Sequence, residues 1–81
     1  MNVKVRLFAR AKEIAGSDCV TVDVPDTAKV LDIRNALATQ FPDLSTLASS
    51  LLISLGTDYA DDTMSVPYGA EVACFPPVSG G

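Results

Sequence analysis

Residues 2–8 read Asn2-Val3-Lys4-Val5-Arg6-Leu7-Phe8, and apolar side chains alternate with charged ones through most of this stretch. A period of two is typical of a half-buried strand, because successive side chains point to opposite faces of a sheet. The same alternation places Phe8 on the outer face of the sheet. We therefore predict a first strand at 2–8 with an exposed aromatic ring and three inward residues: Val3, Val5 and Leu7.

The next segments predict a short helix and a second strand. Ala9–Ala15 consists of good helix formers and ends at Gly16, a residue suited to the left-handed position after a helix. Cys19–Val24 alternates like the first strand, and Pro25 ends it. We therefore expect the two strands to pair as a hairpin.

The main helix is predicted at 30–41, where apolar residues recur at helical spacing. Asp26 or Thr27 is its predicted N-terminal cap, and Pro42 ends it. The inward residues are Val30, Ile33, Leu37 and Phe41. The outward residues are Asp32, Arg34, Asn35 and Gln40.

The rest of the chain predicts smaller elements. They begin with a short helix at 44–50 and a strand at 51–55, which ends at Gly56 and whose pairing register the pattern does not determine. An edge strand near Tyr59 or Met64, a turn at Tyr68-Gly69 and a last strand at 71–75 follow. Pro76-Pro77 ends the last strand, because proline cannot donate a ladder hydrogen bond. We predict an α+β domain at 1–75, with one main helix on one face of a mixed sheet, and a flexible tail at 76–81. The order of elements resembles that of the β-grasp fold of ubiquitin-like proteins.

Composition and charge exclude several classes of function. The chain has 81 residues and a net charge of −4, and its six basic residues are scattered, which disfavours a nucleic-acid partner. Its charged start is unlike a signal peptide, and no apolar run is long enough to cross a membrane. We expect a cytosolic protein without a nucleic-acid or membrane partner.

The residues that usually bind metals or perform catalysis are few. Histidine is absent, and Cys19 and Cys74 alone cannot complete a zinc or iron–sulfur site. We expect both cysteines to be small buried residues without a disulfide, and Asp61-Asp62 to be a solvated pair in a polar loop. The sequence thus predicts no metal, no bound cofactor and no catalytic centre within the chain.

Two aromatic residues lie on the face opposite the predicted core. Parity places Phe75 outward in the last strand, as it does Phe8 in the first. In a β-grasp sheet these two strands are neighbours, so both rings, joined by Tyr59, would form an apolar patch suited to docking a partner. The alternative is a bulge at either strand end that turns its ring under a loop.

The chain ends Val78-Ser79-Gly80-Gly81, which is either an ordinary frayed end or a reactive one. Two residues without side chains can enter a narrow channel and leave the Gly81 carboxylate open to attack. A carboxylate must first be activated, for instance by adenylation in a partner enzyme. A sulfur donor can then displace the nucleotide and leave a nucleophilic thiocarboxylate.

Residues 7–16 (LFARAKEIAG) and 69–81 (GAEVACFPPVSGG) resemble the small, sulfur-carrying subunits of molybdopterin synthase, and the similarity covers nearly the whole chain. The resemblance implies that a ubiquitin-activating-type enzyme uses ATP to adenylate Gly81, which a sulfur donor protein converts to a thiocarboxylate. The tail, Pro76 to Gly81, then inserts into the large subunit of a heterotetramer with two small and two large subunits. Sulfur from two successive tails converts cyclic pyranopterin monophosphate into the molybdopterin dithiolene.

In this family the positions of Phe8, Tyr59 and Phe75 pack against the large subunit, in keeping with the predicted patch. Gly56, Ala70 and Cys74 depart from the family pattern, although Gly56 still permits the positive φ of a turn. Two alternatives remain open. One is a carrier for thiazole synthesis or tRNA thiolation, and the other is a ubiquitin-like protein modifier.

Overall fold

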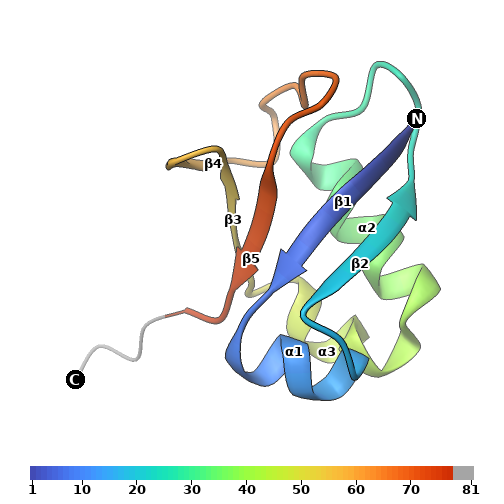
Figure 1. Ribbon diagram of the computed structural model, residues 1–81, viewed down its shortest axis with the longest axis vertical. Coiled ribbons are helices and arrows are strands. Elements are labelled where there is room, and N and C mark those ends of the chain that lie inside the picture. The colour runs from blue at the N-terminus through green and yellow to red at the C-terminus, as the bar shows by residue number, and fades with distance from the viewer. Residues whose placement is uncertain (78–81) are drawn as a thin grey trace.

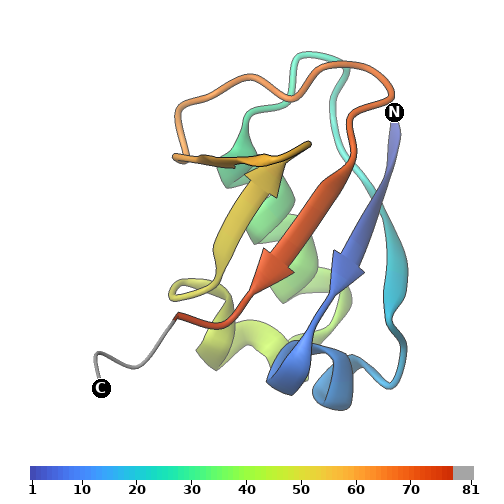
Figure 2. The ribbon, with the colours of Figure 1, turned by 60° about the vertical axis from the view of Figure 1, so that its left-hand side comes forward.

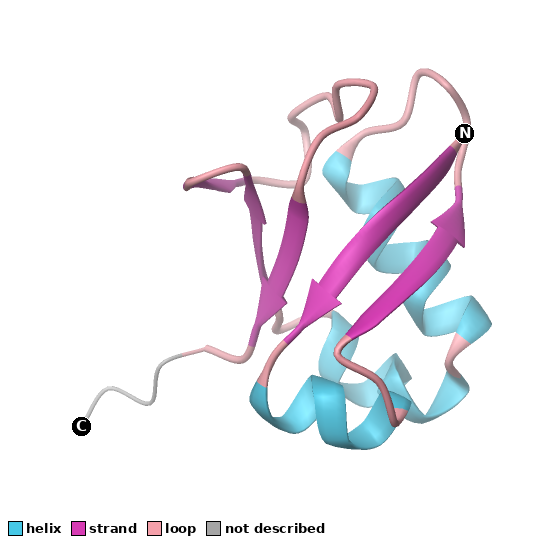
Figure 3. Cartoon of the chain, in the orientation of Figure 1, coloured by secondary structure: helices cyan, strands magenta, loops and turns pink. Residues whose placement is uncertain are grey.

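A five-stranded mixed sheet carries the long helix on one face (Figures 1 and 3). The computed structural model describes residues 1–77. Its strands are β1 (Asn2–Leu7), β2 (Cys19–Asp23), β3 (Leu52–Leu55), β4 (Asp58–Ala60) and β5 (Val72–Phe75). Its helices are α1 (Ala9–Ala15), α2 (Val30–Gln40), the 3-10 turn η1 (Pro42–Leu44) and α3 (Ser45–Ala48). This is the α+β, β-grasp arrangement that the sequence predicts.

The strand order in the sheet is β2-β1-β5-β3-β4. β1 and β2 form the predicted antiparallel hairpin, with Val5 opposite Val20. β1 and β5 run parallel at the centre of the sheet (Figure 2). Leu7 of β1 lies opposite Cys74 of β5. The first and last strands are therefore neighbours, as the predicted patch requires.

The core lies between the sheet and α2. The inward residues of β1 are buried, as are Val30, Ile33 and Leu37 of α2, each of which has no exposed surface. Phe41 is only half-buried, because α2 ends at Gln40 and Phe41 is its C-terminal cap. The predicted inner faces of the first strand and of the main helix are thus confirmed.

The turns occur where glycine permits a positive φ. Gly16, Gly56 and Gly69 have φ values of +74°, +64° and +77°, which an alanine would adopt only with strain. Gly16 also donates its backbone N–H to the Lys12 carbonyl at 2.9 Å and so ends α1. The turn at Gly56 is therefore retained, although this residue departs from the family pattern.

Two predictions of helix boundaries are wrong. Neither Asp26 nor Thr27 caps α2, which begins after Lys29, where the Asp32 carboxylate accepts the Lys29 backbone N–H at 2.8 Å. The reason is that residues 26 and 27 form a separate turn before the helix. The predicted helix at 44–50 is shorter, since only Ser45–Ala48 is α-helical, after the 3-10 turn. None of the helices in residues 1–77 is long and apolar enough to cross a membrane.

Candidate functional site

The predicted tail begins where β5 ends, at Phe75. Pro76 is half-buried and Pro77 is exposed, and neither has an N–H with which to continue the sheet. The other predicted tail residues lie outside the described part of the chain: Val78, Ser79, Gly80 and Gly81. The end of β5 therefore fixes the point from which the tail starts (Figure 1).

An apolar patch covers the outer face of the sheet beside this point. The rings of Phe8 and Phe75 are stacked, with centroids 4.8 Å apart and planes 8° from parallel. Tyr59 meets Phe75 edge to face at 6.3 Å. Leu52 is the residue directly opposite Phe75 in the neighbouring strand. These four residues are called the outer-face patch: Phe8, Leu52, Tyr59 and Phe75.

The patch is accessible, although unequally so. Tyr59 is 68% exposed, and Phe8 and Leu52 are each 38% exposed. Phe75 is half-buried rather than exposed as predicted, because the other two rings pack against it. The alternation of side chains along the strand thus predicts the correct face for Phe75, but it does not predict how far neighbouring side chains cover the ring.

Leu52 is the member of the patch that the sequence did not reveal. The stretch at 51–55 is apolar on both faces except at Ser54, so its pattern does not fix which residues face the core. In the structure Ile53 is buried, whereas Leu52 and Ser54 lie on the outer face. Ser54 was the available signal, because one hydroxyl in an apolar strand marks the less buried side. It is nevertheless only 6% exposed, between its neighbours Tyr59 and Ala73.

The position of Phe8 depends on an unusual backbone conformation at the next residue. Ala9 has φ +53° and is the only non-glycine residue with a positive φ in residues 1–77. The positive φ of Ala9 turns the chain from the outer face of the sheet, where Phe8 lies, to the inner side, where Ala11 is fully buried. A left-handed alanine costs about 1–2 kcal/mol, so the fold stores strain directly beside the patch.

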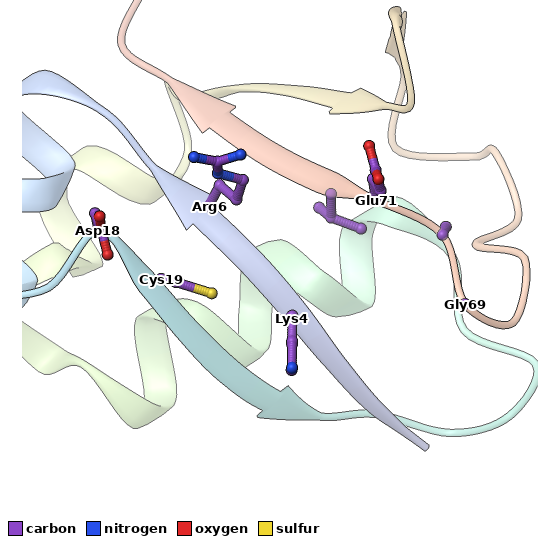
Figure 4. Close-up of a pocket in the computed structure, with 8 residues that line it drawn as sticks. Lys4, Arg6, Asp18, Cys19, Gly69 and Glu71 are labelled. Carbon is purple, nitrogen blue, oxygen red and sulfur yellow. The ribbon is translucent and has the colours of Figure 1, made fainter.

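A groove of about 430 Å³ continues the outer face beyond the patch (Figure 4). Lys4 and Arg6 from β1 point from the same face as Glu71, and no ion pair joins them in the described part of the chain. The Arg6 guanidinium also lies 5.9 Å from the centroid of the Phe8 ring, a cation–π distance. The remaining lining residues are Asp18, Cys19, Gly69, Ala70 and Val72. The groove is open and of mixed charge.

The two cysteines have different environments. Cys74 is buried, as predicted, and burial raises the pKa of its thiol to about 12. Cys19 is exposed, which contradicts the prediction that both are buried, because β2 alternates and turns Val20 and Val22 inward instead. Both thiols are free in the structure.

Of the acidic pair, Asp61 is exposed, as predicted, whereas Asp62 is half-buried. Asp61 accepts hydrogen bonds from the Thr63 hydroxyl at 2.6 Å and the Thr63 N–H at 2.9 Å, which lower the pKa of its carboxyl. Asp62 pairs with Arg34 at 3.0 Å. Arg34 therefore does not face outward as predicted, because Asp62 and two main-chain carbonyls bind its guanidinium. Among residues 1–77 no three His, Cys, Asp or Glu side chains lie close enough together to hold a metal ion.

A family model described as the ThiS family matches residues 5–81. The molybdopterin synthase sulfur carrier subunit of Arabidopsis thaliana is 33% identical over 81 residues, which are 100% of this chain and 84% of that protein. The Homo sapiens subunit of the same name is 30% identical over 83 residues, with coverage of 99% and 94%. The crystal structure of H. volcanii small archaeal modifier protein 1 is 32% identical, with a TM-score of 0.85 over 95% of this chain and 98% of that chain. The similarity thus extends through the described domain and the end of the chain.

Proposed function

We propose, because the chain belongs to the ThiS family, that it is the sulfur carrier subunit of a molybdopterin synthase and carries sulfur on the carboxylate of Gly81. The observation that carries this proposal is the position of the outer-face patch. Phe75, the residue at its centre, comes immediately before Pro76, where the tail begins. A partner that binds the patch is therefore placed to receive the tail.

The proposed chemistry takes place on the tail and in two partner enzymes. In an adenylating enzyme the Gly81 carboxylate attacks the α-phosphorus of ATP, forms an acyl adenylate and releases pyrophosphate. A sulfur donor that supplies hydrosulfide then attacks the carbonyl carbon, and AMP leaves. The resulting thiocarboxylate is a stronger nucleophile than the carboxylate, so it can attack a substrate carbon in the next partner.

That next partner is the large subunit of molybdopterin synthase, and the substrate is cyclic pyranopterin monophosphate. In each transfer the thiocarboxylate sulfur bonds to a substrate carbon, and water then cleaves the bond between this sulfur and the Gly81 carbonyl carbon. The sulfur stays on the substrate and Gly81 returns to a carboxylate, so two loaded chains supply the two sulfurs of the dithiolene. We propose a heterotetramer of two small and two large subunits in the cytosol. The chain binds no cofactor in this scheme, and ATP is used by the adenylating enzyme.

The role of this chain is to present the tail rather than to catalyse the reaction. The outer-face patch supplies the apolar contact area, since aromatic residues commonly dominate the energetics of docking surfaces. Pro76 and Pro77 keep the following residues out of the sheet, because they cannot extend its hydrogen bonding. Val78 and Ser79 lead to Gly80 and Gly81, whose lack of side chains suits a narrow channel in the partner.

The intact mass of the native chain, purified from its cells with an untagged C-terminus, tests the proposal. We expect a fraction of the chains to carry the mass increase of one oxygen replaced by sulfur, and to co-purify with a molybdopterin synthase large subunit. Loss of this fraction when the adenylating enzyme is deleted is the second expected result. A chain that never gains sulfur would contradict the proposal.

A second candidate function is that of a protein modifier, favoured by the full-length similarity to H. volcanii small archaeal modifier protein 1. Both functions begin with an activated Gly81, but a modifier transfers its carbonyl carbon to a lysine amine and forms an isopeptide bond. Lysine conjugates found by mass spectrometry, without any thiocarboxylate, would favour this candidate. A carrier for thiazole synthesis or tRNA thiolation would show the sulfur mass shift but would not bind the molybdopterin synthase large subunit.

A further inference from the structure

Arg34 binds three separate parts of the chain with one guanidinium. Its Nη1 donates to the carbonyls of Ala48 at 2.5 Å and Leu51 at 2.7 Å. Its Nε and Nη2 lie 3.1 Å and 3.0 Å from the same Asp62 carboxylate oxygen. The Arg34 side chain is only 14% exposed, and Ala48 and Leu51 are buried, so its bonds to the two carbonyls are shielded from water, whereas Asp62 is 43% exposed. Charge-assisted bonds of this kind are stronger than those between neutral groups.

Two of these three partners are the ends of one hairpin. Leu51 immediately precedes β3, and Asp62 follows β4 by two residues. The Asp62 carbonyl also accepts the Leu31 backbone N–H at 3.1 Å, a second bond between α2 and the same end of the hairpin. Arg34 therefore closes the base of the β3–β4 hairpin and ties it to α2.

The hairpin needs such a constraint, because its outer strand is short and lies at the edge of the sheet. β4 has three residues and, within residues 1–77, pairs only with β3. β3 is also held by its pairing with β5, so β4 is the strand that depends most on contacts at the base of the hairpin. Leu52 and Tyr59, half of the outer-face patch, are carried by this hairpin, whereas Phe8 follows β1 and does not belong to it.

We propose that Arg34 is a positioning residue for partner docking, which acts through the β3–β4 hairpin on Tyr59 and Leu52. The inference rests on the proposed function, in which the outer-face patch binds the large subunit. Arg34 itself lies on α2, on the inner side of the sheet, and is not part of the patch. Substitution of Arg34 should therefore weaken docking only by the share of the binding energy that Leu52 and Tyr59 contribute.

Substitution of Arg34 by methionine removes the guanidinium but keeps a long apolar stem. The carbonyls of Ala48 and Leu51 then lose their donor, and the Asp62 carboxylate, 43% exposed, can turn to water. Arg34→Lys keeps the charge but lacks the planar fork that reaches all three partners. We expect Arg34→Met to weaken binding to the large subunit by about tenfold, and Arg34→Lys by less.

A double-mutant cycle separates positioning from a general structural role. Binding to the purified large subunit is measured by calorimetry for Arg34→Met alone and combined with either Tyr59→Ala or Phe8→Ala. We expect the effect of Arg34→Met to fall below about threefold in the Tyr59→Ala background and to stay near tenfold in the Phe8→Ala background. Lys29→Met, which removes an exposed cation just before the same helix, is the matched control and should bind like the wild type. Equal effects in both backgrounds would overturn the proposal.

Hydrogen exchange of the chain alone gives a readout that needs no partner. In Arg34→Lys we expect the amides of β3 and β4 to lose protection while the β1–β2 pairs keep theirs. Asp62→Asn, which removes the charge that pairs with Arg34, should give the same selective loss. Both variants keep the readout available if Arg34→Met does not fold. Uniform loss of protection across the sheet would overturn the proposal. A wild-type chain that fails to bind the large subunit, with the selective exchange intact, would contradict the proposed function and not the hairpin restraint.

Discussion

The rings of Phe8 and Phe75 stack with their planes 8° apart, although 66 positions of sequence separate them. The contact is possible because β1 and β5 are parallel neighbours whose ends coincide, with Leu7 opposite Cys74. Each ring follows an inward residue by one position, so both point to the outer face. The stacked rings therefore lie at the end of β5, where the tail begins.

Substitution of Phe75 by aspartate should weaken binding to the large subunit by at least about thirtyfold, because it places a charge at the centre of an apolar patch. The free energy of unfolding should fall by about 1 kcal/mol, from the loss of the two aromatic contacts. Calorimetry and thermal melts measure the two effects. Tyr68→Asp is the matched control, since Tyr68 is 91% exposed and outside the patch. Equal losses of binding in the two variants would contradict the role of the patch.

Extension of the chain by one alanine after Gly81, or substitution of Gly80 by leucine, should abolish sulfur transfer. The extension removes the Gly81 carboxylate, and leucine is too wide for a channel that fits glycine. Thermal melts should not change, since both changes lie beyond β5. Tyr68→Ala, at an exposed residue outside both the tail and the outer-face patch, should remain active in a reconstituted molybdopterin assay. An active extended chain would refute the proposed chemistry.

Alkaline pH should destabilise the fold through Cys74, because burial raises the pKa of its thiol from 9.0 to about 12. Above pH 9.0 the unfolded chain releases this proton while the folded chain keeps it. The free energy of unfolding should therefore fall with rising pH over this interval, by up to about 1.4 kcal/mol per pH unit. Urea titrations at several pH values measure the slope. Cys74→Ala should be less stable at neutral pH but show a shallower slope, and an unchanged slope would exclude Cys74 as the cause.

Substitution of Ala9 by glycine should raise the free energy of unfolding by about 0.5 kcal/mol. Glycine adopts φ +53° without strain, which outweighs its greater freedom in the unfolded chain. Ala15→Gly, at the other end of α1, should instead lower it by about 1 kcal/mol, since Ala15 is an ordinary helical position. Urea unfolding compares the two variants. Equal losses would show that Ala9 is not strained.

The sequence predicted the strands well where one face is apolar and the other polar. The alternation in 2–8 and 19–24 fixed two strands and their inner faces, and the glycines at 16, 56 and 69 marked turns. The same alternation places the Cys19 thiol on the exposed face. The expectation of a buried thiol was wrong because it rested on the usual burial of cysteine and not on this pattern. Prediction was weakest at 51–55, where both faces are apolar and Leu52 was missed.

By itself the sequence determined the α+β class, the inner faces of the first, second and last strands, and the outward direction of Phe8 and Phe75, because each depends on side chains a few positions apart. Only the tertiary structure decided that Arg34 turns inward to close the β3–β4 hairpin and that Leu52 joins the patch. The physical reason is that these features depend on partners distant in the chain. Local periodicity shows which way a side chain points from its own element, but the strand register and the packing of α2 determine what it meets there.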